Sequence, residues 1–189
     1  MKRYVTVIGE ITAQTFQNYV NNAHAGRDYF RSVGQGDPSD VLISSPGGDI
    51  GYMLAILDDI DYWKRTTYAT GINQSAAAIL ATAGEGKRIC TMDALFRFIP
   101  PVPEGTEDKV SDHRFFLHSL CIARLAARLK CPRIEVHDMF DGEFISSTRA
   151  KELGLIDEII STEVPNGDID RLPGSQEPLK LKPDEFLRD

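Results

Sequence analysis

The sequence predicts an α/β fold in one domain, and three observations lead to that prediction. The chain has 189 residues, a length that suits a single domain of about 150–200 residues. Hydrophobic residues make up 42% of the chain, which is enough for one core. Segments with strand character and segments with helix character alternate as far as about residue 160, and this is the pattern of α/β proteins.

The N-terminal part predicts a strand, a helix and a loop. Residues 4–8 are β-branched and aromatic, and they predict a strand. Thr12 is a suitable N-cap for a helix, because apolar residues recur after it at helical spacing. The polar, glycine-containing residues 26–40 predict a loop that includes at most a short helical piece.

The middle of the chain predicts two more strand–helix pairs. Residues 41–43 form a short apolar run typical of a buried strand. After a Pro-Gly-Gly turn, an amphipathic pattern over residues 50–60 predicts a helix. Residues 66–70 predict another strand, and the small apolar residues 75–83 predict a buried helix that packs closely against a sheet.

Later segments complete the alternation. Residues 88–91 and 95–99 are predicted to be extended, and a proline-containing loop at 100–112 separates them from a helix at 113–130. Pro132 is placed to open a short further helix.

The C-terminal part predicts the end of the domain. Ser147 is expected to cap a helix that Gly154 ends, and residues 155–160 predict a last strand. Residues 161–189 hold four prolines and little apolar content, so they predict a tail that is extended, disordered or ordered only against a partner. The predicted organisation is a domain at residues 1–160 and a polar tail at residues 161–189.

Charge and cysteine content argue against several classes of protein. The chain has 21 Lys and Arg against 28 Asp and Glu, a net charge of −7, which argues against nucleic-acid binding. No apolar run approaches the roughly 20 residues that span a bilayer, and Glu10 interrupts the apolar N-terminus too early for a signal peptide. The odd set of Cys90, Cys121 and Cys131 indicates reduced thiols in a cytoplasmic protein, without a disulfide framework or metal site.

Two short motifs are candidates for a functional site. Ser-Pro-Gly-Gly-Asp at residues 45–49 follows a strand, and its glycines let a backbone N–H face a ligand; taken alone, a tight turn also explains it. Gly-Ile-Asn-Gln-Ser at residues 71–75 places Ser75 at the first turn of a helix, where unpaired N–H groups suit an oxyanion. The alternative there is an ordinary N-cap serine.

Together, the two motifs resemble those of the Clp protease proteolytic subunit (ClpP) family. The similarity continues through residues 78–88, which include Ala-Ile-Leu-Ala and Gly-Lys-Arg, and residues 144–157, which include Phe-Ile-Ser and Gly-Leu-Ile-Asp. It covers about residues 3–163, in the family's order. The resemblance implies the ClpP/crotonase-like superfold of repeated ββα units, in rings that stack into a barrel with the active sites inside.

Carried over position by position, the resemblance assigns a serine-peptidase site with one member missing. Ser75 matches the nucleophile, and the amides of Gly48 and Ala76 match the oxyanion hole. Ile99 falls where the family has its catalytic histidine. Because isoleucine cannot accept a proton, the usual triad is broken.

The third member of the triad, an aspartate, has two candidate positions. Counting from the upstream side gives Asp141, whereas counting back from Phe144 gives Gly142. Asp141 is the preferred candidate. Without a histidine to orient, its more ordinary role is that of a solvated loop charge.

No other residue is expected to replace the missing base. The four histidines are His24, His113, His118 and His137. Each is expected to be an ordinary surface or interface residue. A replacement base must come within hydrogen-bond reach of Ser75, and none of the four is expected to do so. Lys87 directly precedes the predicted strand at residues 88–91, away from Ser75, and it matches a family position with no catalytic role.

Three functions follow from these residues. The retained Ser75 and Gly48 favour a ClpP-like serine peptidase. Ile99 favours a catalytically silent subunit that builds a ring or modulates an active paralogue, and any peptidase activity is therefore expected to be weak or absent. A crotonase-type enzyme acting on an acyl-CoA ranks last, because it leaves Ser75 unexplained.

The resemblance also implies the kind of partner. It predicts a homo-oligomeric ring of seven subunits, single or stacked, which an AAA+ unfoldase or a ClpP paralogue would join. Exposed apolar residues on the helix at 113–130 agree with an oligomer. Peptides or unfolded proteins are the expected substrates of an active subunit, and no cofactor, metal, nucleic acid or membrane is expected.

Overall fold

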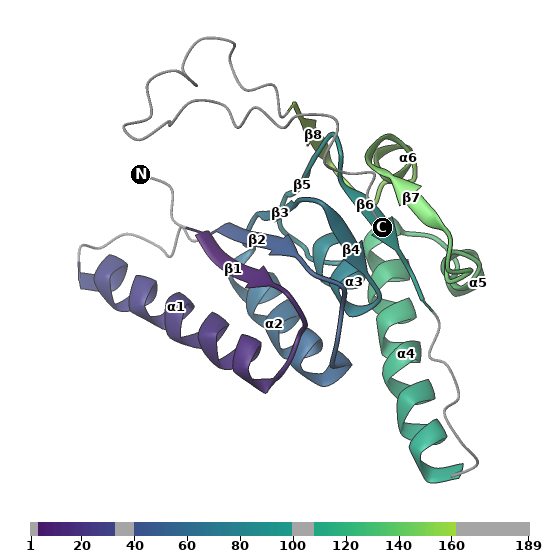
Figure 1. Ribbon diagram of the computed structural model, residues 1–189, viewed down its shortest axis with the longest axis horizontal. Coiled ribbons are helices and arrows are strands. Elements are labelled where there is room, and N and C mark those ends of the chain that lie inside the picture. Colours follow the sequence, from purple (N-terminus) through teal and green to yellow (C-terminus); the bar gives the residue numbers. More distant parts are fainter. Residues whose placement is uncertain (1–3, 33–39, 100–107, 162–189) are drawn as a thin grey trace, which may run out of the picture.

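The computed structural model describes residues 4–32, 40–99 and 108–161, in which strands and helices alternate (Figure 1). The strands are β1 (Tyr4–Ile8), β2 (Asp40–Ser44), β3 (Thr67–Ala69), β4 (Ile72–Gln74), β5 (Arg88–Thr91), β6 (Leu95–Arg97), β7 (Phe144–Ser146) and β8 (Glu158–Ile160). The helices are α1 (Ala13–Ser32), α2 (Ile50–Trp63), α3 (Ala76–Thr82), α4 (Asp108–Leu129), α5 (Arg133–His137) and α6 (Ser147–Glu152). The predicted α/β class is confirmed.

The strands form two sheets. The larger sheet has the order β1-β2-β3-β5-β8, and all of its neighbouring strands are parallel. The smaller sheet has the order β4-β6-β7, with β4 parallel and β7 antiparallel to the central β6. Because β4 follows β3 after only two residues, the chain passes directly from one sheet to the other just before Ser75.

One face of the larger sheet carries the core. Val5 and Val7 of β1 and Val41 and Ile43 of β2 are buried, and the residues between them are half-buried or exposed. This alternation follows from the twofold periodicity of a strand. Helices α1, α2 and α3 lie along the buried face in Figure 1. On the other face, Tyr4 is exposed and Leu42 and Tyr68 are half-buried among the described residues.

Helix α3 fills the space between the two sheets. All seven of its residues are buried, and it contacts β2, β3, β4, α2 and α4. Its sequence, Ala-Ala-Ala-Ile-Leu-Ala-Thr, is dominated by small side chains. Small side chains allow several neighbours to approach one helix at close-packed density, and this confirms the prediction of a closely packed, buried helix.

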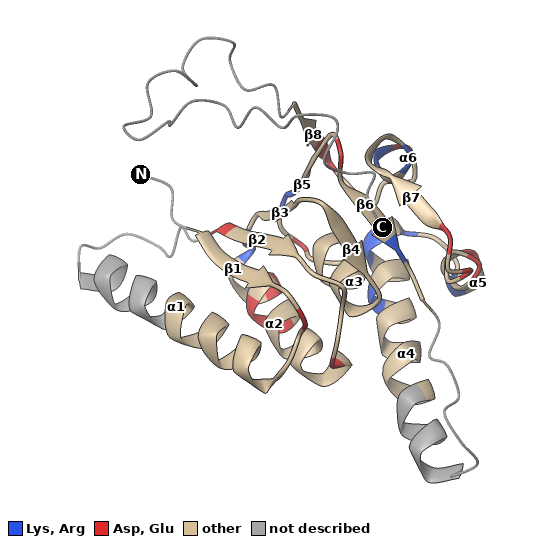
Figure 2. Cartoon of the chain, in the orientation of Figure 1, with Lys and Arg blue, Asp and Glu red and all other residues tan. Residues whose placement is uncertain are grey.

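Ion pairs join α2 to its surroundings, and the acidic residues of this helix are coloured red in Figure 2. Asp59 of α2 accepts hydrogen bonds from the buried Arg65 (3.0 Å) and from the Tyr19 hydroxyl (2.8 Å). Arg124 of α4 binds Asp61 at 2.7 Å and also pairs with Asp58. These contacts fix the carboxyl end of α2 to both α1 and α4.

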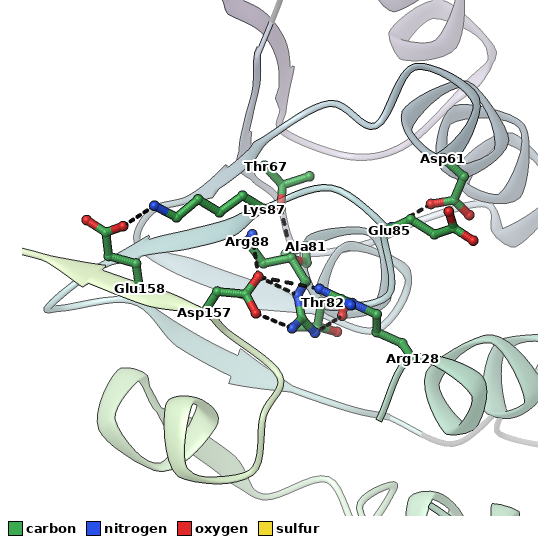
Figure 3. Close-up of polar contacts among 10 residues, drawn as sticks. All are labelled: Asp61, Thr67, Ala81, Thr82, Glu85, Lys87, Arg88, Arg128, Asp157 and Glu158. Atoms are coloured by element: carbon green, nitrogen blue, oxygen red, sulfur yellow. Dashed lines mark hydrogen bonds and ion pairs between the residues drawn. The ribbon is translucent and has the colours of Figure 1, made fainter. Parts of the chain in front are cut away.

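A second polar network holds the carboxyl end of α3 (Figure 3). The buried Arg88 guanidinium donates to both carboxylate oxygens of Asp157, at 3.0 and 2.6 Å, and to the carbonyl of Thr82 at 3.0 Å. The Thr67 hydroxyl donates to the carbonyl of Ala81 at 3.2 Å. The last carbonyls of a helix have no partners within it, so Arg88 and Thr67 satisfy groups that burial would otherwise leave unpaired.

Two helices are longer than predicted. Helix α1 begins after Thr12, whose hydroxyl accepts from the N–H of Thr15 at 3.3 Å, so the predicted cap is confirmed. It then continues to Ser32 through part of the predicted loop 26–40, because Gly26 costs a helix only about 1 kcal/mol. Helix α4 begins at Asp108, five residues before the predicted start at residue 113.

Other boundaries also differ from prediction. Residues 72–74 form the strand β4, which the sequence did not indicate. The cap of α6 is Ser146, whose hydroxyl accepts from the N–H of Arg149 at 3.2 Å. Ser147 was predicted to be the cap, but its side chain is buried and donates to the carbonyl of Met92 at 2.6 Å.

Several sequence-based expectations concern cysteines, membranes and the tail. Cys90, Cys121 and Cys131 are free thiols, and burial raises the pKa of both Cys90 and Cys121 to about 11. None of the helices within residues 4–32, 40–99 and 108–161 is both long and apolar enough to cross a bilayer. The predicted tail, apart from Ser161, lies outside the described residues.

The network around α3 predicts a selective loss of stability. Arg88→Gln removes the partner of Asp157 and of the Thr82 carbonyl, and we expect it to lower the free energy of unfolding by about 3 kcal/mol. Lys87→Gln is the matched control, because Lys87 pairs with Glu158 at the surface, and no comparable loss is expected. Urea denaturation of both variants measures the difference, and equal losses would contradict the assignment.

The same pair predicts a pH dependence. Burial raises the pKa of Asp157, but hydrogen bonds and charge from Arg88 and the charge of Arg128 outweigh burial and lower it overall. A lowered pKa in the folded state stabilises the protein above the unfolded value of about 3.9, and this contribution is lost as pH falls through the folded value. The stability gap between the wild type and Arg88→Gln should therefore narrow below about pH 3.9 in acid titrations of stability.

Candidate active site

Ser75 lies in a strained turn between β4 and α3. Its φ and ψ angles are 50° and −121°, a conformation that non-glycine residues rarely adopt. Backbone hydrogen bonds on both sides hold it there, from the N–H of Gln74 to the carbonyl of Ser45 (3.1 Å) and from the N–H of Ser75 to the carbonyl of Arg97 (2.8 Å). The Ser75 side chain makes no capping hydrogen bond to α3, so an ordinary N-cap role does not explain this serine.

The glycine turn at residues 47–48 packs directly against Ser75. A Cβ atom on Gly47, where φ is 102°, would lie 2.7 Å from the carbonyl oxygen of Gln74 and 3.0 Å from the Cβ of Ser75. A Cβ atom on Gly48, where φ is 142°, would lie 2.3 Å from the carbonyl oxygen of Ile11. The turn is thus pressed between Ile11 and the Ser75 turn, and only glycine fits at either position.

Two backbone N–H groups beside Ser75 have no backbone partner in the described structure, one in the glycine turn and one at the start of α3. The N–H of Ile11 donates to the Gly47 carbonyl at 2.7 Å, and the N–H of Asp49 donates to the Ile11 carbonyl at 2.8 Å. This pairing leaves out the N–H of Gly48. Within the described parts of the chain, the N–H groups of Gly48 and Ala76 donate to no backbone carbonyl, and such groups can hold a developing oxyanion.

Ile99 follows β6 on the side of the strand away from the core. Phe96 and Phe98 are fully buried, whereas Leu95, Arg97 and Ile99 are half-buried, so side chains alternate between two faces up to Ile99. An isoleucine contributes neither a proton acceptor nor a donor at this place.

Asp141 is an exposed residue of a loop that β6 holds. One of its carboxylate oxygens accepts from the N–H of Glu143 at 2.8 Å, which shapes its own turn. Gly142 is the residue that contacts β6: its N–H donates to the Phe98 carbonyl at 3.1 Å, and its carbonyl accepts from Nε of Arg97 at 2.5 Å. The Asp141 carboxylate therefore orients its loop, and no histidine in the described residues is bonded to it.

The two histidines with described side chains lie together behind β6. His118 is buried and its ring contacts those of Phe140, at 4.6 Å between centroids, and His137, at 6.4 Å. Phe140 in turn contacts Phe98, at 5.4 Å, and Phe98 faces away from the Ile99 side. Burial, and then the neighbouring His137, lower the pKa of His118. No hydrogen bond joins either ring to Ser75 in the described structure.

The remaining candidates for a general base at Ser75 are His24, His113 and Lys87, and no contact in the described structure supports any of them. The side chains of His24 and His113 lie outside the described residues. The ammonium of Lys87 binds Glu158 beyond the carboxyl end of α3, whereas Ser75 precedes its amino end. The hydrogen bond from Lys87 to Glu158 raises the pKa of this lysine, which opposes the neutral form that a base requires.

One contributor to the site was not predicted from the sequence. The carbonyl of Arg97 accepts the N–H of Ser75, and its guanidinium holds the loop of Asp141 and Gly142. The sequence signal for this was the extended segment predicted over residues 95–99, whose first three residues form β6 and pair with both β4 and β7.

Comparisons with known proteins agree with this architecture. A sequence model described as Clp protease matches residues 3–163. The chain is 28% identical over 157 residues to ATP-dependent Clp protease proteolytic subunit 1 of Salinibacter ruber, with 76% of this chain and 64% of that protein covered. It is 28% identical over 139 residues to the subunit of the same name from Corynebacterium diphtheriae (67% and 66% covered) and 30% identical over 133 residues to that from Rhodococcus jostii (64% and 59% covered). The chain thus spans less than two thirds of the length of each relative.

A solved structure shares the fold. The ClpP protease catalytic domain from Plasmodium falciparum superposes with a TM-score of 0.69 at 24% identity, covering 86% of this chain and 87% of that one. The fold is accordingly that of the ClpP proteases. Since the family's sequence model spans most of the chain, this protein belongs to the Clp protease family.

The packing of Gly47 predicts a local steric effect. Gly47→Ala places a methyl group against the Ser75 turn and should lower the free energy of unfolding by about 3 kcal/mol. Gly9→Ala is the control: its φ is also positive, at 78°, but nothing lies within 4 Å of its Cβ position. That variant should lose only about 1 kcal/mol. Denaturation of both variants measures the contrast, and similar losses would mean that Gly47 is needed only for its backbone angle.

Proposed function

We propose that this chain is a ClpP-like serine-peptidase subunit with Ser75 as its nucleophile and weak or absent turnover. The observation that carries the proposal is the strained Ser75 turn, packed against the glycine turn, with a side chain that does not cap α3. The N–H groups of Gly48 and Ala76 are the proposed oxyanion hole. Their lack of backbone partners supports this role.

The proposed weakness comes from the missing base. Attack of the Ser75 oxygen on a peptide carbonyl transfers a negative charge to the carbonyl oxygen, which the two N–H groups would stabilise. The serine proton must leave at the same time, and a general base contributes typically about 100- to 10,000-fold to such a step. Ile99 accepts no proton, Asp141 is engaged in its own turn, and His118 lies behind Phe98.

The second candidate function is a catalytically silent subunit of the same ring. The same absence of a base favours it, together with the intact backbone of the site. Such a subunit would contribute a binding surface or a structural position beside an active ClpP paralogue. Chemistry at Ser75 separates the two candidates.

Apolar surface on the larger sheet, on the face away from the core, supports the proposal that the chain binds a protein partner. An apolar hollow of about 260 Å³ lies on it. Its lining residues are Tyr4, Leu42, Tyr68, Ala69, Thr70, Thr91 and Ile160. On α4, Phe115, Phe116 and Leu120 are exposed as well. Apolar surfaces of this kind are usually covered by partners.

The proposed assembly follows from those two surfaces and from the relatives, which are named as proteolytic subunits of an ATP-dependent protease. We assign the chain to a ring of seven copies, alone or stacked, that works with an AAA+ unfoldase or a ClpP paralogue. Peptides or unfolded proteins are the proposed substrates. Free cysteines agree with a cytoplasmic location.

Reactivity of Ser75 is the direct test of the proposal. A fluorophosphonate probe should label the protein slowly at one site, and Ser75→Ala should abolish the label. Ser119→Ala is the control, because Ser119 is an exposed serine of α4 whose hydroxyl donates to the Phe115 carbonyl, and it should label as the wild type does. Intact-protein mass spectrometry reports the stoichiometry, and no labelling of the wild type would leave the silent subunit as the function.

Restoring a base at residue 99 tests why turnover is weak. Ile99→His should raise the hydrolysis of short fluorogenic peptides by about 100- to 10,000-fold. Ile99→Val, which changes the volume without adding a proton acceptor, should give no gain. If Ile99→His folds and labels at Ser75 but gains no hydrolysis, the isoleucine is not what limits the reaction.

A further inference from the structure

Arg97 lies on the same face of the smaller sheet as residues that border the candidate site. Across the three strands, Gln74, Arg97 and Phe144 are register partners, so their side chains share one face. The opposite face carries Asn73 and Phe96, both fully buried. The Arg97 side chain therefore stands on the solvent side, and Ile99, two residues further, follows the same alternation.

The strand also places Arg97 immediately beside the nucleophile candidate. Its carbonyl accepts the N–H of Ser75 at 2.8 Å, and its register partner Gln74 directly precedes Ser75. A peptide bound at Ser75 would consequently pass within reach of a long side chain from residue 97.

The guanidinium is held in a fixed position. Its Nε donates to the carbonyl of Gly142 at 2.5 Å, and its central carbon lies 5.1 Å from the centre of the Phe144 ring. A hydrogen bond at one edge and an aromatic face together restrict a side chain that is otherwise flexible. Preorganisation of this kind reduces the entropy lost when a ligand binds.

The outer edge of the same guanidinium has no protein partner in the described structure. Its terminal nitrogens make no hydrogen bond or ion pair, although Asp141 and Glu143 lie in the loop that Nε contacts. The Asp141 carboxylate binds the Glu143 N–H instead. Two parallel N–H donors on a planar fork match the two oxygens of a carboxylate.

We propose that Arg97 is a specificity-determining residue that binds a carboxylate of the peptide held at the Ser75 site. The carboxylate belongs either to an Asp or Glu side chain or to the C-terminus of the peptide. The inference rests on the proposed function, in that it takes the Ser75 site to be the place where peptides bind. It adds a class of ligand, peptides that present a carboxylate to Arg97, that the positions of the family's motifs do not imply.

Matched peptides test the proposal in the full-length chain. Three fluorescein-labelled nonapeptides of Leu and Ala would be used: one with a central Glu and an amidated C-terminus, one with Gln in its place, and one with Gln and a free C-terminal carboxylate. Fluorescence anisotropy with Ser75→Ala, in which cleavage cannot interfere, gives the affinities. At least one carboxylate peptide should bind about tenfold more tightly than the neutral one, and the arm that shows the gain identifies the source of the carboxylate.

Variants assign the preference to Arg97. With Arg97→Gln, the carboxylate and neutral peptides should bind with equal affinity. Arg97→Lys keeps the positive charge but loses the two parallel N–H donors, and it should reduce the preference. Arg149→Gln, which removes an exposed arginine of α6 paired with Glu152, changes the net charge equally and should leave the ratio intact. A general loss of structure would weaken the binding of all three peptides alike. A change in the ratio of the carboxylate and neutral affinities therefore reports recognition of the carboxylate.

The outcomes separate this inference from the proposed function. Equal affinities for all three peptides, no binding of any of them, or a preference that survives Arg97→Gln would overturn it. A fluorophosphonate probe that fails to label Ser75 would overturn the peptidase assignment alone. A preference that depends on Arg97 would then mark a site on a silent subunit that binds peptide carboxylates.

Discussion

The confinement of α3 between two sheets is the constraint on which the rest of the structure depends. A helix of seven buried residues favours small side chains, and the last carbonyls of its buried carboxyl end need partners within the protein. Arg88 and Thr67 therefore serve the carboxyl end, while the amino end opens toward the glycine turn. The crossing from β3 to β4 within two residues is what brings Ser75 to that end.

The features that sequence reasoning recovered are those encoded locally. The buried character of α3 follows from its own run of small residues, and the turn at Gly47 and Gly48 follows from two adjacent glycines. Strand β4 was missed because Ile72, Asn73 and Gln74 carry no strand pattern of their own. They are extended because β6 pairs with them from more than twenty positions along the chain.

The candidate site likewise contains residues that local motifs predicted and contacts between distant residues that they did not. Ser75, Gly48 and Ala76 lie within two short motifs, so spacing along the chain was enough to propose them. The hydrogen bond that joins Arg97 to Gly142 links residues 45 positions apart, and no local sequence pattern encodes a contact over that separation. The choice between Asp141 and Gly142 had the same limit: counting residues left it open, whereas the contacts show that Gly142 meets the strand and Asp141 shapes the loop.

The geometry of the Ser75 turn is maintained by main-chain atoms, since its N–H is held by one strand and its carbonyl by the first turn of α3. Those bonds do not depend on which side chain stands at residue 99. The geometry of this turn and the side chain at residue 99 are consequently separable, so that side chain can change without loss of the turn.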